Sequence, residues 1–182
     1  KTWRFDDGKL PEGFKVAGGK WEVRDGKLRA YDGEPDQYRT MLLAPCQWPM
    51  VRIAFDVSLQ PRIPGRLGDV CVSLNADPET GKFDKGYAVL VGQYWNQASV
   101  CYRLFIPIAR TESSPLKAGE THHMVFEFTG NHLRQWADDR VVIEAWDREH
   151  PLAMDPARAI GLSVYDTAMV IDNLTIQAPA KQ

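Results

Sequence analysis

The sequence predicts an all-β chain in which about twelve antiparallel strands form a sandwich or a barrel. Three observations lead to this prediction. Apolar and polar residues alternate with a period of two along many short segments. Turn-forming residues separate these segments at intervals of roughly 8–12 residues. Helical pattern is confined to one turn at residues 155–158, which Pro156 would begin.

The centre of the chain predicts a long hairpin. Residues 86–93 and residues 99–106 each alternate as strands do, with β-branched and aromatic side chains. An Asn-Gln pair between them suits a turn. Tyr94 and Trp95 stand side by side at the tip of this turn, and we expect both rings to be exposed at a rim of the fold.

The remaining strands are predicted from the same alternation. Residues 19–31 form a second hairpin, because Asp25-Gly26 is a strong type I′ turn signal. Residues 50–60 form the longest regular strand, with one buried face and one wet face. Further strands are expected at residues 40–44, 69–75, 121–128, 132–137, 141–146, 159–165 and 169–177.

Two polar segments are expected to lie outside the regular strands. Residues 1–18 are rich in Gly and Pro and should form an edge or wrapping segment. Residues 109–120 should form a long polar connection. No repeat or linker divides the chain, so we predict one domain over residues 1–182.

Composition excludes several classes of protein. With 182 residues, 44% hydrophobic and 25% charged, the chain can bury a sizeable core without a metal or a disulfide. A net charge of −2, with acids and bases interspersed, argues against nucleic acid as a partner. No apolar run approaches the roughly 18 residues of a membrane span. The chain begins at Lys1 rather than Met, and with six Trp residues this favours a secreted or periplasmic protein whose leader has been removed.

Three cysteines, an odd number, cannot all pair within the chain. Cys71 and Cys101 should lie in the strands on either side of residues 86–93. Two strand spacings separate them by roughly 10 Å, which is too far for a disulfide. We therefore expect buried free thiols.

Four stretches resemble a known superfamily. They are the opening WRFDD with KWEVRDGKL, the central GYAVLVGQYWNQASVCYR, the hairpin LRQWADDRVVIEAWDREHPL, and the closing IGLSVYDTAMVIDNLTIQ. The chain is similar to concanavalin A-like (lectin/glucanase) jelly rolls, the group that includes laminin-G-like domains and 3-keto-disaccharide hydrolase-like domains. The hairpin departs from the family pattern, since Asp139-Arg140 replaces the usual Asp-Gly. The resemblance implies a jelly-roll β-sandwich, and this superfold hosts lectins, hydrolases, lyases and structural modules.

The sequence contains none of the common catalytic motifs. The E-x-D-x-x-E strand of laminarinase-type hydrolases has no counterpart, and Glu144 and Asp147 do not have its spacing. Asp56 and Glu127 stand alone in their strands. His122 and His123 must point to opposite faces of one strand, so they cannot share a metal. No motif of a serine hydrolase, zinc enzyme or nucleotide enzyme occurs.

A calcium ion is the one cofactor that the sequence leaves open. Asp172 in the last strand, with Asp6 or Asp7 from the first segment, could supply hard oxygen ligands. The alternative is that Asp172 and Asn173 make turn or edge hydrogen bonds to the backbone.

Aromatic rings beside planar polar groups indicate a carbohydrate site, because sugars present apolar faces and hydroxyl edges. Trp21 and Trp146 are expected in the core, whereas Trp136 is left open between core and ligand. The candidate ligand-binding residues are Gln93, Tyr94, Trp95, Asn96 and Arg103, followed by Tyr38, Arg39, Arg134 and Trp136.

Three functions remain open from the sequence. The first is carbohydrate binding, in glycan recognition or polysaccharide degradation outside the cytoplasm. The second is a glycoside hydrolase or lyase, which the resemblance allows. The third is a structural or interaction module without a small ligand. A deep cleft with perturbed acids would favour the enzyme, and an aromatic platform would favour the binder.

Overall fold

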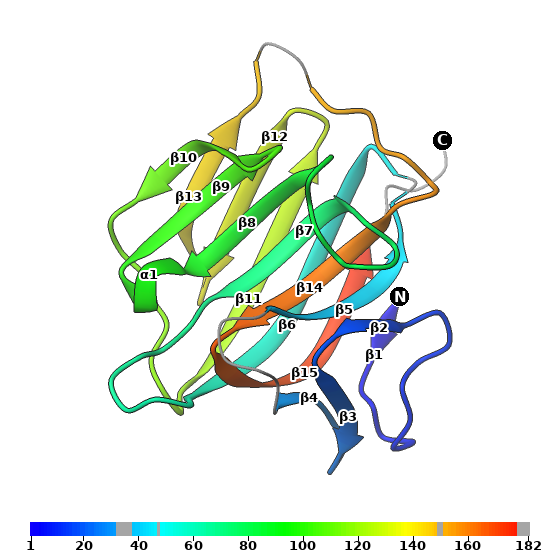
Figure 1. The fold of residues 1–182 in the computed structure, drawn as a ribbon, viewed down its shortest axis with the longest axis vertical. Helices are drawn as coiled ribbons and strands as arrows, with labels where there is room; N and C mark the ends of the chain where they lie inside the picture. The colour runs from blue at the N-terminus through cyan, green and yellow to red at the C-terminus, as the bar shows by residue number, and fades with distance from the viewer. Residues whose placement is uncertain (32–37, 47, 149–150, 178–182) are drawn as a thin grey trace.

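Two antiparallel sheets pack face to face as a jelly-roll β-sandwich, which confirms the predicted fold class (Figure 1). The structure is a computed structural model that describes residues 1–31, 38–46, 48–148 and 151–177, with only the backbone at 38 and 39. The eight-stranded sheet has the order β13-β12-β11-β6-β15-β4-β3, and β1 pairs with β15. The seven-stranded sheet has the order β10-β9-β8-β7-β14-β5-β2.

The bounds of the strands are close to those predicted. In the eight-stranded sheet they are β1 (Thr2–Trp3), β3 (Lys20–Arg24), β4 (Lys27–Tyr31), β6 (Met50–Pro61), β11 (Thr121–Thr129), β12 (His132–Ala137), β13 (Arg140–Trp146) and β15 (Thr167–Gln177). In the seven-stranded sheet they are β2 (Lys15–Gly18), β5 (Tyr38–Pro45), β7 (Val70–Ala76), β8 (Tyr87–Gly92), β9 (Ala98–Arg103), β10 (Ile106–Thr111) and β14 (Ala159–Tyr165).

Fifteen strands are present in the described residues, rather than about twelve. The three additional strands are β1, β2 and β10, which fall in segments predicted as a wrapping segment and a polar connection. β1 and β2 are short, and β2 and β10 lie at the two edges of the seven-stranded sheet. Edge strands need little apolar alternation because half of their backbone faces solvent.

A single large core fills the space between the sheets. Burial alternates along β6 as its sequence predicted, with Phe55 stacked on Phe126 of β11 at a centroid distance of 5.8 Å. By contrast, β7 and β8 are buried along their whole length. The outer face of the seven-stranded sheet is therefore partly covered over β7 and β8.

The predicted helical turn at residues 155–158 is wrong. It is a hydrogen-bonded turn, in which Arg158 N donates to Asp155 O at 2.9 Å. The short helical element α1 (Gln93–Asn96) lies instead at the tip of the β8–β9 hairpin.

The prediction for the two tryptophans was half correct. Trp21 is in the core, whereas Trp146 is 50% exposed and stacks on the His132 ring at 3.8 Å. Trp146 lies on the edge strand β13, where alternation does not reveal which face has a covering layer.

All three cysteines are free and buried, as predicted. Cys71 and Cys101 lie on β7 and β9, the neighbours of β8. They face opposite ways, because Cys101 belongs to the core between the sheets and Cys71 to an apolar cluster with Leu90 and Ala88. In the described part of the chain, no helix is long and apolar enough to span a membrane.

Candidate functional site

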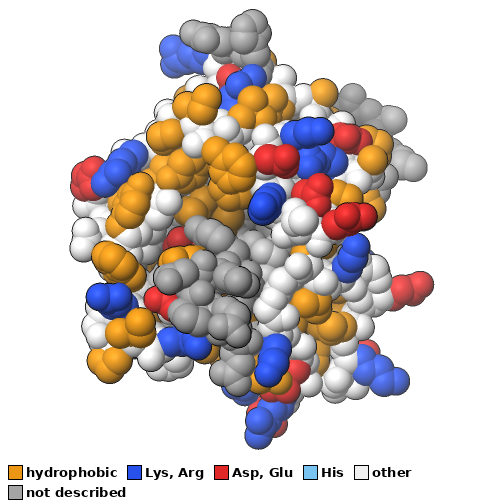
Figure 2. All heavy atoms as spheres, viewed as in Figure 1, with side chains coloured by type: hydrophobic (Ala, Val, Ile, Leu, Met, Phe, Trp, Pro, Cys, Tyr) orange, Lys and Arg blue, Asp and Glu red, His pale blue; other side chains and the backbone are white. Residues whose placement is uncertain are grey.

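A groove of about 710 Å³ lies on the outer face of the seven-stranded sheet. Figure 1 looks onto this sheet, and Figure 2 shows hydrophobic side chains gathered on the same face over the β8–β9 hairpin. Strands, the β7–β8 loop and the α1 tip all contribute to its walls. The lining residues are Ala17, Gly18, Thr40, Cys71, Thr80, Gly81, Lys82, Phe83, Leu90, Gln93, Tyr102, Phe105 and Ser163.

Small side chains in register create the floor of the groove. Ser163 of β14 pairs with Cys71 on one side and with Thr40 on the other, and the Thr40 and Ser163 hydroxyls lie 3.0 Å apart. In the next row Gly161 pairs with Ser73, and a Cβ at Gly161 would approach Ser73 Oγ to 2.6 Å. A side chain at Gly161, one row from the residues that line the groove, would therefore require Ser73 to shift.

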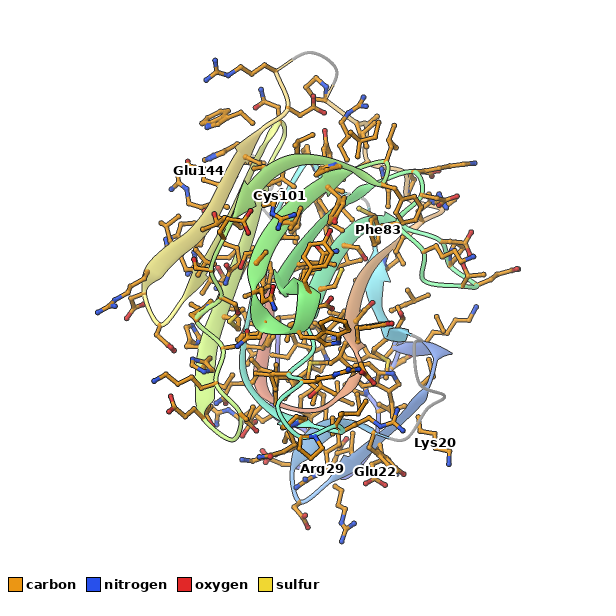
Figure 3. The ribbon with its side chains drawn as sticks, turned by 60° about the vertical axis from the view of Figure 1, so that its left-hand side comes forward. Lys20, Glu22, Arg29, Phe83, Cys101 and Glu144 are labelled. Carbon is orange, nitrogen blue, oxygen red and sulfur yellow. The ribbon has the colours of Figure 1, made fainter. Side chains whose placement is uncertain are left out.

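Three aromatic rings form one wall. Phe83 lies 4.4 Å from Phe105 and 6.1 Å from Tyr102, measured between ring centroids. Phe105 is 51% exposed, so its ring is available to a ligand. Figure 3 shows Phe83 at the end of the sandwich where β8 begins.

Tyr102 joins this aromatic wall to the hairpin tip. Its hydroxyl donates to Gln93 Oε1 at 2.9 Å. Burial raises the pKa of Tyr102, and the neighbouring Tyr94 hydroxyl raises it further. Tyr102 therefore stays protonated at neutral pH and offers a hydroxyl beside an apolar surface, as a sugar-binding wall requires.

The β7–β8 loop, which supplies Thr80 to Phe83, is held by Asp77. The Asp77 carboxylate accepts hydrogen bonds from the Thr80 and Glu79 N–H groups at 2.8 and 3.0 Å. These bonds lower the pKa of Asp77 to about 2. Arg158 pairs with Asp77 and with Asp84 near the other end of the loop, at 3.4 and 3.0 Å. The loop is thus fixed before any ligand arrives.

The hairpin tip places the predicted aromatic pair at the rim. Tyr94, Trp95 and Asn96 have φ values of 56°, 56° and 68°, so the tip is a left-handed turn rather than a right-handed helix. The Tyr94 and Trp95 rings are 50% and 51% exposed. Their exposure agrees with the geometry expected from the sequence.

Two of the predicted residues have structural roles. Asn96 Nδ2 donates to Leu116 O at 2.7 Å, which anchors the tip to a neighbouring loop. Arg103 lies at the far end of β9, where its Nε donates to Asp147 Oδ2 at 2.7 Å. The Tyr87 hydroxyl donates to the same oxygen at 2.6 Å. Arg103 is thus tied to the end of the sandwich and does not line the groove.

Arg134 and Trp136 lie on the other sheet. They project from the outer face of β12, where Arg134 bonds to Glu144 Oε1 at 2.8 Å and its Cζ lies 5.2 Å from the Trp136 ring centroid. Figure 3 shows Glu144 on β13, in the layer opposite Phe83. The structure therefore does not bring this pair together with the hairpin tip.

Tyr38 and Arg39 belong to β5, paired with Tyr165 and Val164 of β14. Their side chains are outside the described residues.

The acids and histidines form ion pairs away from the groove. His123 Nδ1 lies 2.7 Å from Asp56 Oδ1, and Asn173 Nδ2 donates to the other Asp56 oxygen at 2.7 Å. Asp172 lies opposite Asp56 in the register, whereas Asp6 approaches Gly26. Among the described residues, no three His, Cys, Asp or Glu side chains are grouped to hold a metal ion.

Sequence reasoning missed much of the groove. Phe83 and Phe105 were unassigned loop or strand positions, while Thr40 and Ser163 were ordinary strand residues. The available signal was the apolar character of residues 87–91 on both strand faces, since a strand buried on both sides has something covering its outer face.

The two packed sheets define a jelly-roll β-sandwich that carries a groove on one outer face. Comparison with known proteins identifies its family. Residues 3–177 match the model of the 3-keto-alpha-glucoside-1,2-lyase-like domain, and the chain belongs to that family. This confirms the resemblance found in the sequence. No curated protein sequence matches the chain.

Solved structures show the same fold at low sequence identity. The carbohydrate-binding module CBM66 from Bacillus subtilis is 19% identical, with a TM-score of 0.69 over 91% of this chain and 96% of that one. A galectin-like protein of unknown function from Bacillus subtilis is 10% identical, with a TM-score of 0.72 over 94% and 91%. The exoplasmic/lumenal domain of VIP36, bound to calcium and mannose, is 8% identical, with a TM-score of 0.71 over 100% and 91%.

Proposed function

We propose that this chain binds carbohydrate in the groove on the outer face of the seven-stranded sheet. The observation that carries the proposal is the groove itself, which has a volume of about 710 Å³. It is lined by an aromatic wall and by the paired hydroxyls of Thr40 and Ser163. A sugar ring needs an apolar surface for its C–H face and hydroxyl or amide groups for its edge. Gln93 supplies the amide at the end nearest the hairpin tip.

The proposal includes Tyr94 and Trp95 as a rim that continues the groove. Gln93 lines the groove and precedes them directly in the chain. The carbohydrate-binding module and the mannose-bound lectin among the similar structures support this proposal through their fold. We further propose that the chain is one domain and that it acts outside the cytoplasm, as expected from the sequence.

A glycan array followed by titration calorimetry tests the groove. Phe105→Ala should weaken binding of the best ligand by roughly tenfold, which corresponds to the loss of one aromatic contact. Trp95→Ala should also weaken binding, with the melting temperature nearly unchanged because half of its ring is exposed. Trp146→Ala is the matched control, since that ring is equally exposed on the other sheet. Equal affinities for Phe105→Ala and Trp146→Ala would remove the groove from the proposal.

A lyase acting on a sugar is the second candidate, and the description of the family favours it. Proton abstraction next to a carbonyl needs a base within hydrogen-bond reach. Among the described residues that line the groove, none is Asp, Glu or His. Tyr102 is protonated at neutral pH because its pKa is raised, so its hydroxyl is not available as a base. Incubation with 3-keto-glucosides and a search for released aglycone would establish the lyase, whereas binding without turnover supports the binder. If the protein shows neither binding nor turnover, the structural module remains as the third hypothesis.

A further inference from the structure

An arginine beside the groove has no counter-charge among the residues that the structure describes. Arg66 lies in the loop between β6 and β7, and its Cζ is 4.8 Å from the centroid of the Trp95 ring. The residue is exposed. Within the described part of the chain, the Trp95 ring is the contact of its guanidinium, and no carboxylate pairs with it.

The other arginines near the groove are neutralised. Arg110, which lies over the Tyr94 ring, pairs with Glu112 at 2.7 Å. Arg158 pairs with Asp77 and Asp84. Arg66 therefore differs from these two arginines, because no carboxylate of the described residues pairs with its guanidinium.

A guanidinium stacked on an aromatic ring remains able to bind an oxyanion. Stacking uses the face of the planar group, whereas its N–H donors point outward in the plane. These donors form two parallel hydrogen bonds with a carboxylate and several with a sulfate. The Trp95 ring thus contacts the Arg66 guanidinium, and donors of this group remain for an oxyanion.

The tip that carries Trp95 is held rigidly. Three successive non-glycine residues adopt left-handed φ values, which L-residues avoid without support. Gln97 N donates to Gln93 O at 3.0 Å and Asn96 anchors the turn to Leu116. The backbone that carries the ring under Arg66 is therefore anchored on both sides of Trp95.

The groove matches this cation in charge. Lys82 lines it, and no carboxylate is found among its described lining residues. Gln93 connects the end of the groove to the tip, so a ligand longer than the groove would pass over Tyr94 and Trp95. We propose that the ligand is an acidic glycan, whose carboxylate or sulfate binds Arg66 beyond the end of the groove. This inference rests on the proposed carbohydrate function.

The test compares acidic and neutral forms of the same glycan backbone. The probes are oligogalacturonate, its carboxyl-reduced neutral form, and a sulfated galactan oligosaccharide, titrated into the full chain. Arg66→Gln is compared with Arg24→Gln, which removes the same charge from an exposed arginine on β3 of the other sheet. The wild type should bind an acidic probe roughly tenfold more tightly than the neutral form, as one charge-assisted pair allows.

The outcomes separate the two proposals. Arg66→Gln should bind the acidic and neutral probes equally, while Arg24→Gln should behave as the wild type. Preference for the carboxylate or for the sulfate identifies the acidic group. If the neutral probe binds as tightly as the acidic ones, or if Arg66→Gln and Arg24→Gln agree, this inference is overturned while Phe105→Ala still reports on the groove. If no glycan of the array binds, both proposals fail.

Discussion

The outer faces of the two sheets carry similar residue types and differ in what those residues contact. On the eight-stranded sheet, Trp136 lies beside Arg52 and Arg134, and Trp146 stacks on His132. Arg52 pairs with Glu127, and Arg134 and His132 share Glu144. The aromatic rings on this face are therefore contacted by the protein's own Arg and His side chains, and those side chains pair with its own acids.

The seven-stranded sheet shows the opposite arrangement. Phe83, Tyr102 and Phe105 contact one another and border a hollow, and Arg66 has an aromatic contact but no described carboxylate. The number of aromatic residues therefore does not distinguish a binding face from a solvated face. What distinguishes them is whether side chains of the same chain already satisfy the rings and charges.

The largest expected difference between the faces concerns added volume. Gly161→Val should lower the free energy of unfolding by about 1–3 kcal/mol, because its new side chain would overlap Ser73. Ala54→Val, at a half-buried position on the outer face of β6, should change it by less than about 0.5 kcal/mol, since valine suits a strand. Urea denaturation of both variants measures the difference. Equal losses would mean that the sheet next to the floor of the groove can adjust as freely as the solvated face.

The second expected difference concerns how each face lowers a carboxylate pKa. Hydrogen bonds from the Thr80 and Glu79 backbone lower the pKa of Asp77 to about 2, whereas Arg134 and then His132 lower the pKa of Glu144. Salt screens the second cause more than the first. We expect added salt to raise the Glu144 midpoint and to leave that of Asp77 nearly unchanged, as measured by NMR titration.

The low pKa of Asp77 also determines how the stability of the β7–β8 loop depends on pH. A folded pKa of about 2, below the ordinary value of 3.8, stabilises the folded loop at all pH values above 3.8. That contribution is lost as the pH falls from 3.8 through about 2. The amide protons of Glu79 and Thr80 should become less protected over this interval, and Asp77→Asn should remove the transition. An unchanged transition in that variant would assign it to another acid.

The layers of this fold could be predicted from sequence because they depend on local periodicity. Alternation along β6 and the Asp25-Gly26 turn each reflect neighbouring residues, and both are present as expected. Strands such as β10 were missed because an edge strand with Pro107 lacks the buried alternation of an inner one.

The candidate site was harder to predict because it depends on residues far apart in the chain. Arg103 bonds to Asp147, 44 residues away, at the end of β9 opposite the tip that carries Tyr94 and Trp95, and the sequence did not reveal this separation. Phe83 reaches the groove only because the β7–β8 loop folds back over the sheet, where Gly81 packs on Thr40. The exposed aromatic tip was predictable, since it depends on a short turn between two clear strands.

The smallest expected effect lies on the solvated face and tests whether its ion pairs only neutralise one another. A double-mutant cycle with Arg52→Gln and Glu127→Gln should give a coupling energy of about 0.5 kcal/mol, because both side chains are substantially exposed. The coupling should decrease at high salt. A coupling above about 2 kcal/mol would indicate that these pairs hold the sheet together. In that case the ion pairs on the eight-stranded sheet would have a structural role of their own. Their pairing would then not indicate that this face lacks a ligand, and the comparison with Arg66, which has no carboxylate partner among the described residues, would no longer support a binding site.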